Sequence, residues 1–397
     1  MRLTLFCCLF LNSLLSVAQP TVKKAAWSVN TNAPIAGDAS IDGNHIYFGN
    51  EAGDVFCRML KDGSARWQKR LPAGIRSRPV IVRGQLIVNC TNGNVYSLNT
   101  ESGELIWEFN TSGDQQYDYW DYYRSSPVHV NGMIYFGSGD HHVYALDAAT
   151  GKERWKFATG GIVHADPVVQ HDTLYIGSYD GKFYALNALT GEQIWQFKTI
   201  GDRYFPKGEI QKAALITPEA VIFGSRDFNI YALRKTSGRG LWNMKEVGSW
   251  IISTPLHHKG NIYFGTSDTH AFYASAEQDG AVRWSVPIPF RSYNTPVASD
   301  TLIFAGCFNG MLYGFGESGG QVQWRFQTDG SKKNYASVYD ETGHFRKDFT
   351  LYGDHTVTGA AEKKITGLGA ILATPVLKDG ILYFGATDGV FYAVKIR

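Results

Sequence analysis

Seven tryptophans recur along the chain at intervals of about forty residues, and each is preceded by the same two features. A glycine lies four positions before each tryptophan, and a small residue lies ten positions before it. In the copy that runs from Ala145 to Trp155, the glycine is Gly151. Short strands repeated at this period are typical of a β-propeller, in which neighbouring repeats cover each other's faces. The tryptophans are Trp67, Trp107, Trp155, Trp195, Trp242, Trp284 and Trp324.

A second recurring position, the last residue of the YFG and YIG segments, occurs in eight units rather than seven. The eighth unit places Ala393 in the small-residue position but reaches no tryptophan. Trp27 lies 22 residues before Gly49, the same spacing that separates Trp67 from Asn89. We therefore predict an all-β, eight-bladed β-propeller of four-stranded antiparallel blades, whose last blade is closed by the N-terminal strand around Trp27. The eight tryptophans are predicted to be structural and to pack between blades.

Residues 1–18 have the features of a signal peptide. Arg2 precedes an apolar run, and Ser16 and Ala18 are small residues at the −3 and −1 positions. A membrane anchor and a lipoprotein signal are alternatives, although Cys7 and Cys8 lie too early for lipidation. We expect cleavage after Ala18 and export to the periplasm or the extracellular space. Residues 19–397 are then one monomeric propeller domain with no transmembrane segment.

The formal charge of +2 suggests neither a nucleic-acid partner nor a polybasic membrane-binding patch. Cleavage would leave three cysteines, an odd number for a disulfide framework in an oxidising compartment. We interpret Cys57, Cys90 and Cys307 as small buried hydrophobic residues, with reactive thiols as the alternative.

Three connections between blades are longer than the others, at residues 112–123, 201–207 and 328–367. Each joins a fourth strand to the next first strand. In an antiparallel blade all such connections emerge on one face of the disk, so we expect the three insertions to lie on that face. The longest could be a lid or a partner-binding arm.

Aromatic residues with polar tips are concentrated in these connections, and such residues are common in binding surfaces. We predict that they bind a partner protein; the alternative is that they cover the exposed ends of the sheets. The candidates are Tyr117, Tyr119, Trp120, Tyr122, Tyr123, Tyr204, Phe205, Trp250 and Phe290.

Polar residues precede the first strands, which should line the central channel. Blades 1 to 4 carry the charged residues, whereas blades 5 to 8 carry threonine and apolar residues. These charges could hold an anionic or carbonyl-bearing ligand at the channel mouth, or they could form a solvated belt of ion pairs. No nucleophile with a base, phosphate-binding loop or metal-ligand motif is present, so we predict no catalytic or metal-binding residues. The candidate ligand residues are Asp38, Arg76, Arg78, Arg124, His164 and Asp166.

The segments ALDAATGKERW and ALNALTGEQIW resemble the tryptophan-docking motif of the pyrroloquinoline-quinone (PQQ) type β-propeller superfamily. The resemblance covers residues 22–397 and implies the propeller fold. In its dehydrogenase branch it implies a vicinal disulfide, a bound calcium ion and a catalytic aspartate. The only vicinal cysteines are Cys7 and Cys8, and no motif transfers the other roles. The non-catalytic BamB-like branch matches in size, although it is usually lipid-anchored and this chain has no lipobox.

We therefore expect an exported, non-catalytic scaffold without a cofactor. It would bind a protein partner in the cell envelope through its inter-blade loops, with a BamB-like role in outer-membrane protein assembly. The alternative is a periplasmic PQQ-dependent alcohol or sugar dehydrogenase that uses PQQ with calcium.

Overall fold

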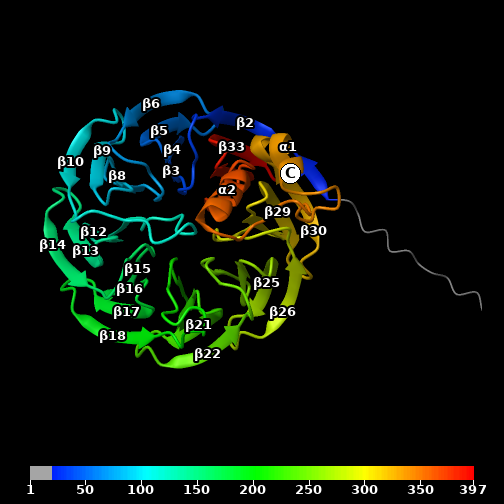
Figure 1. Ribbon diagram of the computed structural model, residues 1–397. Helices are drawn as coiled ribbons and strands as arrows, with labels where there is room; N and C mark the ends of the chain where they lie inside the picture. Colours follow the sequence, from blue (N-terminus) through cyan, green and yellow to red (C-terminus); the bar gives the residue numbers. More distant parts are fainter. Residues whose placement is uncertain (1–19) are drawn as a thin grey trace, which may run out of the picture.

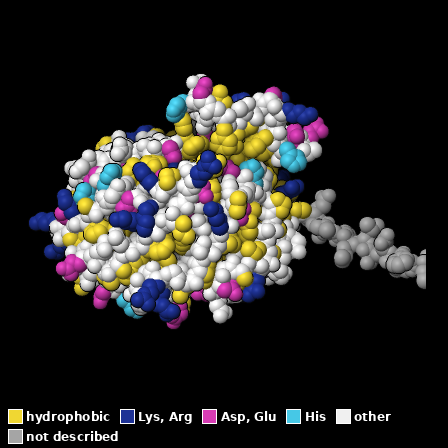
Figure 2. Space-filling model, turned by 60° about the horizontal axis from the view of Figure 1, so that its bottom comes forward, with side chains coloured by type: hydrophobic (Ala, Val, Ile, Leu, Met, Phe, Trp, Pro, Cys, Tyr) yellow, Lys and Arg dark blue, Asp and Glu magenta, His cyan; other side chains and the backbone are white. Residues whose placement is uncertain are grey.

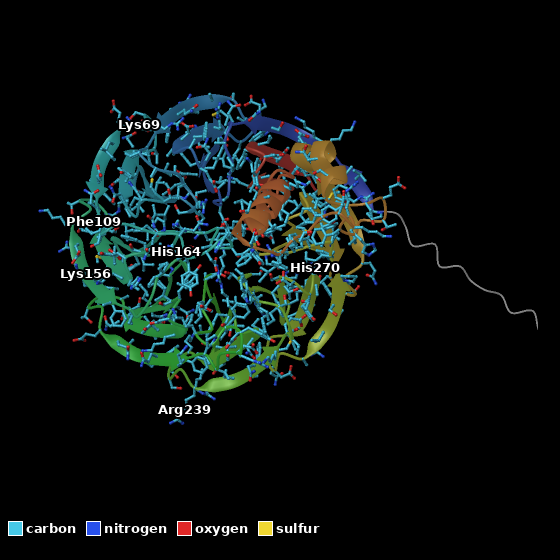
Figure 3. The ribbon with its side chains drawn as sticks, in the orientation of Figure 1. Lys69, Phe109, Lys156, His164, Arg239 and His270 are labelled. Carbon is cyan, nitrogen blue, oxygen red and sulfur yellow. The ribbon has the colours of Figure 1, made fainter. Side chains whose placement is uncertain are left out.

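The computed structural model describes residues 20–397, so the predicted signal peptide lies outside the described residues. Eight small sheets surround a central axis like the blades of a fan (Figure 1), which confirms the predicted eight-bladed propeller. Within a blade, the second strand is buried along almost its whole length, and the fourth strand alternates between buried and exposed residues. Side chains of the outer strands, such as Lys69 and Lys156, point away from the ring, whereas His164 lies near its centre (Figure 3).

Blade 1 contains β3 (Ser40–Asp42), β4 (His45–Gly49), β5 (Asp54–Met59) and β6 (Ala65–Arg70). Blade 2 contains β7 (Val80–Val82), β8 (Gln85–Asn89), β9 (Val95–Asn99) and β10 (Leu105–Phe109). Blade 3 contains β11 (Val128–Val130), β12 (Met133–Gly137), β13 (His142–Asp147) and β14 (Glu153–Ala158). Blade 4 contains β15 (Val168–Gln170), β16 (Thr173–Gly177), β17 (Lys182–Asn187) and β18 (Gln193–Lys198).

Blade 5 contains β19 (Leu215–Ile216), β20 (Ala220–Gly224), β21 (Asn229–Arg234) and β22 (Gly240–Lys245). Blade 6 contains β23 (Leu256–His258), β24 (Asn261–Gly265), β25 (Ala271–Ala276) and β26 (Val282–Pro287). Blade 7 contains β27 (Val297–Ala298), β28 (Leu302–Gly306), β29 (Met311–Gly316), β30 (Val322–Gln327) and β1 (Thr21–Lys23). Blade 8 contains β31 (Val376–Lys378), β32 (Ile381–Gly385), β33 (Val390–Lys395) and β2 (Ala25–Asn30).

The repeated tryptophans join neighbouring blades, as predicted. Trp155 pairs with Ala145 across its own blade, and its indole Nε1 donates to the carbonyl of Ala188 in the next blade at 3.0 Å. The ring also packs against Gly191, where an added Cβ would lie 2.8 Å from ring atoms. Gly191 has a φ of +76°, which favours glycine, so the turn needs this residue for both space and conformation.

The N-terminal strand completes the last blade, which confirms the predicted closure. Trp27 in β2 pairs with Ala393 in β33. Blade 7 has the four predicted antiparallel strands and, in addition, a fifth strand, β1, which runs parallel to β30. Trp324 also departs from the pattern: its indole N–H has no hydrogen-bond partner among residues 20–397, whereas the other repeat tryptophans donate to carbonyls of the next blade.

Apolar residues fill the spaces between adjacent blades, and the three described cysteines belong to this interior. Cys57, Cys90 and Cys307 are each at most 1% exposed and form no disulfide within residues 20–397. Burial raises the pKa of the Cys90 thiol to about 12, so it stays protonated and unreactive at neutral pH.

The three insertions lie together over one face of the disk. The longest contains α1 (Asp329–Asn334), the short helix η1 (Tyr335–Ser337) and α2 (His355–Thr366), and it stands out from the disk (Figure 2). Asp354 caps α2 by accepting a hydrogen bond from the Val357 backbone N–H. Figure 1 shows α2 beside the centre of the ring, above the channel mouth. None of the helices in residues 20–397 has the length and apolar character needed to cross a membrane.

Candidate functional site at the covered channel mouth

Eight residues, one from the start of each blade, surround the channel mouth and are called the rim here. Four from blades 2 to 5 are polar or charged, and four from blades 6, 7, 8 and 1 are apolar or aromatic. The segment 112–123 lies across this rim and contacts both halves. The rim residues are Ala36, Arg76, Arg124, His164, Gln211, Ile252, Tyr293 and Leu372.

Tyr122 and Tyr123 fill the apolar half of the rim. Both belong to one buried cluster with Tyr293 and Leu372. The Tyr123 hydroxyl donates to the Leu372 carbonyl at 3.3 Å, and the Lys212 ammonium lies 3.8 Å from the centre of the Tyr123 ring. The mouth is therefore closed by protein side chains.

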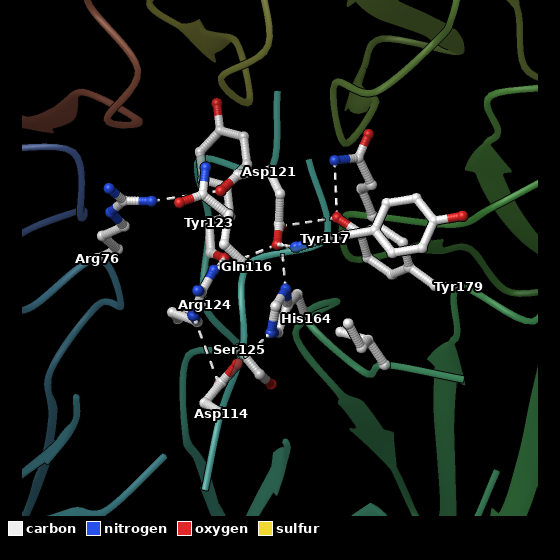
Figure 4. A network of polar contacts seen from close by, with 12 residues as sticks. Arg76, Asp114, Gln116, Tyr117, Asp121, Tyr123, Arg124, Ser125, His164 and Tyr179 are labelled. Carbon is white, nitrogen blue, oxygen red and sulfur yellow. Dashed lines mark hydrogen bonds and ion pairs between the residues drawn. The ribbon is translucent and has the colours of Figure 1, made fainter. Parts of the chain in front are cut away.

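Asp121 anchors the same segment to the polar half (Figure 4). Its Oδ1 atom lies 2.9 Å from Nδ1 of His164 and accepts a hydrogen bond from the Tyr179 hydroxyl at 2.8 Å. The other ring nitrogen of His164, Nε2, lies 2.9 Å from Oδ1 of Asp114. His164 and Asp121 are at most 1% exposed, so these contacts are shielded from water.

The geometry favours a protonated His164. A carboxylate only accepts hydrogen bonds, so both ring nitrogens must donate. Burial opposes this charge, but the negative charge of Asp121 and the hydrogen bonds that the ring donates to both carboxylates raise the pKa of His164. Burial likewise acts against the charge of Asp121, yet His164 and Arg124 hold the pKa of Asp121 at about 2.

Arginines complete the polar half and balance its charge. Arg124 lies 3.4 Å from both Asp114 and Asp121, so with His164 the buried group contains two positive and two negative charges. Arg226 pairs with Asp118 of the same segment. Such pairing is what allows charges to be buried.

The long insertion is joined to this segment through one carboxylate of α2. Glu362 accepts hydrogen bonds from the Trp120 indole at 2.8 Å, from the Tyr122 hydroxyl and from Arg291 at 2.9 Å. Its side chain is 8% exposed. Glu362 therefore fixes α2 to the segment 112–123 and to blade 7.

The six residues predicted to form a ligand site have different partners in the structure, and ligand binding by them stays a prediction. Asp38 and Asp166 accept hydrogen bonds at 2.6 Å from backbone N–H groups of neighbouring blades, those of Thr374 and Ser126. Burial raises the pKa of Asp166. Arg76 pairs with Glu51, and Arg78 is exposed.

A solvated belt of ion pairs, the alternative, does not describe Arg124 and His164. They are 4% and 1% exposed and are paired with carboxylates of the insertion. The sequence does show Asp114, Asp118 and Asp121 beside the aromatic residues, but it gives no local sign that they bind rim residues.

The nine residues predicted to bind a partner fall into two groups. Tyr204, Tyr119 and Tyr117 are 73%, 38% and 37% exposed, and Trp120 and Phe205 are partly buried. The other four are at most 8% exposed, so they cannot contact a partner in this structure and instead cover the sheet ends. These four are Tyr122, Tyr123, Trp250 and Phe290.

Aromatic side chains and α2 close the channel mouth, and the three described cysteines are separate from one another. Within residues 20–397, no group of three or more His, Cys, Asp or Glu side chains is arranged to hold a metal ion.

Fold and site together define a PQQ-type eight-bladed propeller whose channel mouth is covered by its own insertions. The sequence matches the family described as outer membrane protein assembly factor BamB over residues 13–119, 120–245 and 226–397. The chain belongs to this family.

Among curated proteins, BamB of Yersinia pestis is 31% identical over 83 residues, which cover 21% of each chain. The chain thus spans about a fifth of the length of that relative in the match. The solved structure of BamB from Moraxella catarrhalis has a TM-score of 0.53 at 18% identity, covering 94% of this chain and 88% of that one.

A quinohemoprotein alcohol dehydrogenase from Pseudomonas putida has a TM-score of 0.67 at 14% identity and covers 94% of this chain and 76% of its own. At such low identity both structural likenesses show the shared fold alone.

Proposed function

We propose that this protein is an exported, non-catalytic scaffold of the cell envelope that binds a protein partner and takes part in outer-membrane protein assembly. Membership in the BamB family supports the proposed role in outer-membrane protein assembly. The observation that carries the binding role is a group of exposed apolar residues on the insertion face. Ile200, Tyr204 and Val247, called the loop patch here, are 72%, 73% and 79% exposed.

The loop patch is built on well-packed loops. Lys245 and Asp202 form an ion pair at 3.0 Å that joins the end of β22 to the loop before blade 5. Beneath the surface, Phe205 packs edge-on against Trp250 with the ring centres 5.0 Å apart. Exposed apolar residues held on such a base have the form of a binding surface, because little conformational entropy is lost when a partner contacts them.

Site-specific photo-crosslinking tests this function. A crosslinking amino acid is placed at Tyr204 and, as a matched control, at Leu189, which is 63% exposed in a turn on the opposite face. We expect the Tyr204 position to capture a component of outer-membrane protein assembly, identified by mass spectrometry, and Leu189 not to.

Deletion of the gene should also lower the amount of β-barrel proteins in the outer membrane, measured by immunoblotting. Equal capture from both positions together with unchanged barrel levels would contradict the proposal. Fractionation of the cells, with sequencing of the mature N-terminus, tests export and cleavage after Ala18.

A further inference from the structure

The residue that ends the turn between the second and third strands has a positive φ in all eight blades, a conformation that favours glycine. Five blades use glycine there, namely Gly53, Gly93, Gly181, Gly310 and Gly389. Blades 3, 5 and 6 use His141, Phe228 and His270, with φ values of 73°, 72° and 50°. A side chain in this conformation is strained, so each of the three requires a reason.

Packing explains two of these side chains. The Phe228 ring lies 5.5 Å from Phe205 and supports the insertion 201–207. The His270 ring lies 5.1 Å from Phe290 and 6.1 Å from Phe345, and so supports the long insertion. His141 has no such ring contact within residues 20–397. Ring packing therefore does not account for the side chain at position 141.

His141 lines a cavity of about 250 Å³ between two insertions. Lys207 comes from the insertion 201–207, and Gln115, Gln116 and Tyr117 come from the segment 112–123; Figure 4 shows Tyr117 beside Tyr179. At ~30 Å³ per water molecule, this volume can hold a ligand the size of a monosaccharide or an amino-acid side chain. The lining residues are Gln115, Gln116, Tyr117, His141, Gly160, Gly161, Ile162, Tyr179 and Lys207.

The lining has cationic and hydrogen-bonding groups but no Asp or Glu. Lys207 and His141 form no ion pair with any residue in the range 20–397. The acidic residues in the adjacent turns are already engaged: Asp140 accepts from Tyr144 and from the Ser112 N–H, and Asp180 accepts from Tyr184 and from the Gly160 N–H.

We propose that this cavity binds a carboxylate-bearing ligand. The Lys207 ammonium supplies the opposite charge, and the His141 ring and the two glutamine amides supply hydrogen bonds to the carboxylate and its neighbouring polar groups. The carboxylate could belong to an acidic sugar or to an acidic side chain of a peptide, because both present the same group. This site does not depend on the proposed role in outer-membrane assembly.

Calorimetric titration of the purified protein tests the proposal with two matched pairs of probes. D-glucuronate is compared with D-glucose, and N-acetyl-L-glutamate amide is compared with N-acetyl-L-glutamine amide. We expect at least one charged probe to bind at least about tenfold more tightly than its neutral partner, which corresponds to one tenfold step in Kd. The charged probe that binds identifies the source of the carboxylate.

His141→Gly separates binding from folding, because five other blades already carry glycine at this position. We expect this variant to keep or raise the melting temperature while losing binding about tenfold or more. Lys207→Gln should also lose binding, whereas Lys152→Gln, in a turn on the opposite face, should not. Equal affinity for charged and neutral probes, no binding by any probe, or unchanged binding in both site variants would overturn the proposal.

Discussion

The two halves of the rim hold the same segment by different physical means. On the polar side, Asp121 is fixed by directional contacts with His164 and Tyr179, each under 3 Å. On the apolar side, Tyr122 and Tyr123 are held mainly by burial in a cluster. Burial of apolar surface stabilises the fold without depending on direction. A network of buried charges tolerates little displacement of its side chains. The polar half therefore sets the position of the segment, and the apolar half supplies most of the stabilising free energy.

The largest effect is expected from breaking the polar half. Asp121→Ala would leave His164 buried without one of its two carboxylates and Tyr179 without its acceptor. We expect a loss of about 3–5 kcal/mol in the free energy of unfolding, as for other buried pairs that lose one partner. Urea unfolding measures it. A loss below about 1 kcal/mol, the range of an exposed ion pair, would show that the network is not sealed from water.

A smaller loss of stability is expected when either tyrosine of the apolar half is changed to phenylalanine, and the loss should differ between the two. Tyr122→Phe removes a hydrogen bond to the Glu362 carboxylate, whereas Tyr123→Phe removes a 3.3 Å hydrogen bond to a neutral carbonyl. Hydrogen bonds to charged groups contribute about 1.5–3 kcal/mol, and neutral ones about 0.5–1.5 kcal/mol. We expect Tyr122→Phe to destabilise the protein more, as measured by parallel urea titrations. The reverse order would show that Glu362 does not fix α2 to this segment.

The smallest expected effect is a dependence of folding stability on pH. This effect is also the most specific to the polar half of the rim. The pKa of His164 is raised in the folded state, so its stabilisation is fully present below about pH 6.5 and is lost as the pH rises through the raised value. The pKa of Asp121 is lowered to about 2, so its stabilisation is present above about pH 3.8 and is lost as the pH falls through 2.

Melting temperatures measured from pH 4 to pH 9 test the histidine contribution. The wild-type protein should lose stability toward the alkaline end, and His164→Gln should have a flatter profile in that range, since glutamine does not titrate. Tyr123→Phe is the matched control from the apolar half and should keep the wild-type slope. Identical profiles for wild type and His164→Gln would assign the pH dependence to other groups.

The fold could be predicted from the repeat, because a glycine and a small residue precede each repeated tryptophan, such as Trp155, at fixed spacings in the sequence. The division of charge among the blades was also visible. The covering of the rim was not, because it depends on the path of the segment 112–123 through space. Nothing local distinguishes the buried Tyr122 from the exposed Tyr119 in a run of similar residues.

Two further details lay beyond sequence reasoning. The strand β1 has three residues and no alternating pattern that would assign it to a sheet. His141 sits in a turn where only the backbone conformation reveals that a glycine would be the ordinary choice.

The strands β1 and β2 follow one another in the chain but belong to different blades, 7 and 8. The N-terminal segment therefore acts as a strap across the closing joint of the ring. Force applied at residue 20 would first strip β1 from β30, across three residue pairs, before any load reached β2. Pulling on the N-terminus is therefore expected to open the ring in two successive steps, the loss of the β1 pairing and then the loss of the β2 pairing.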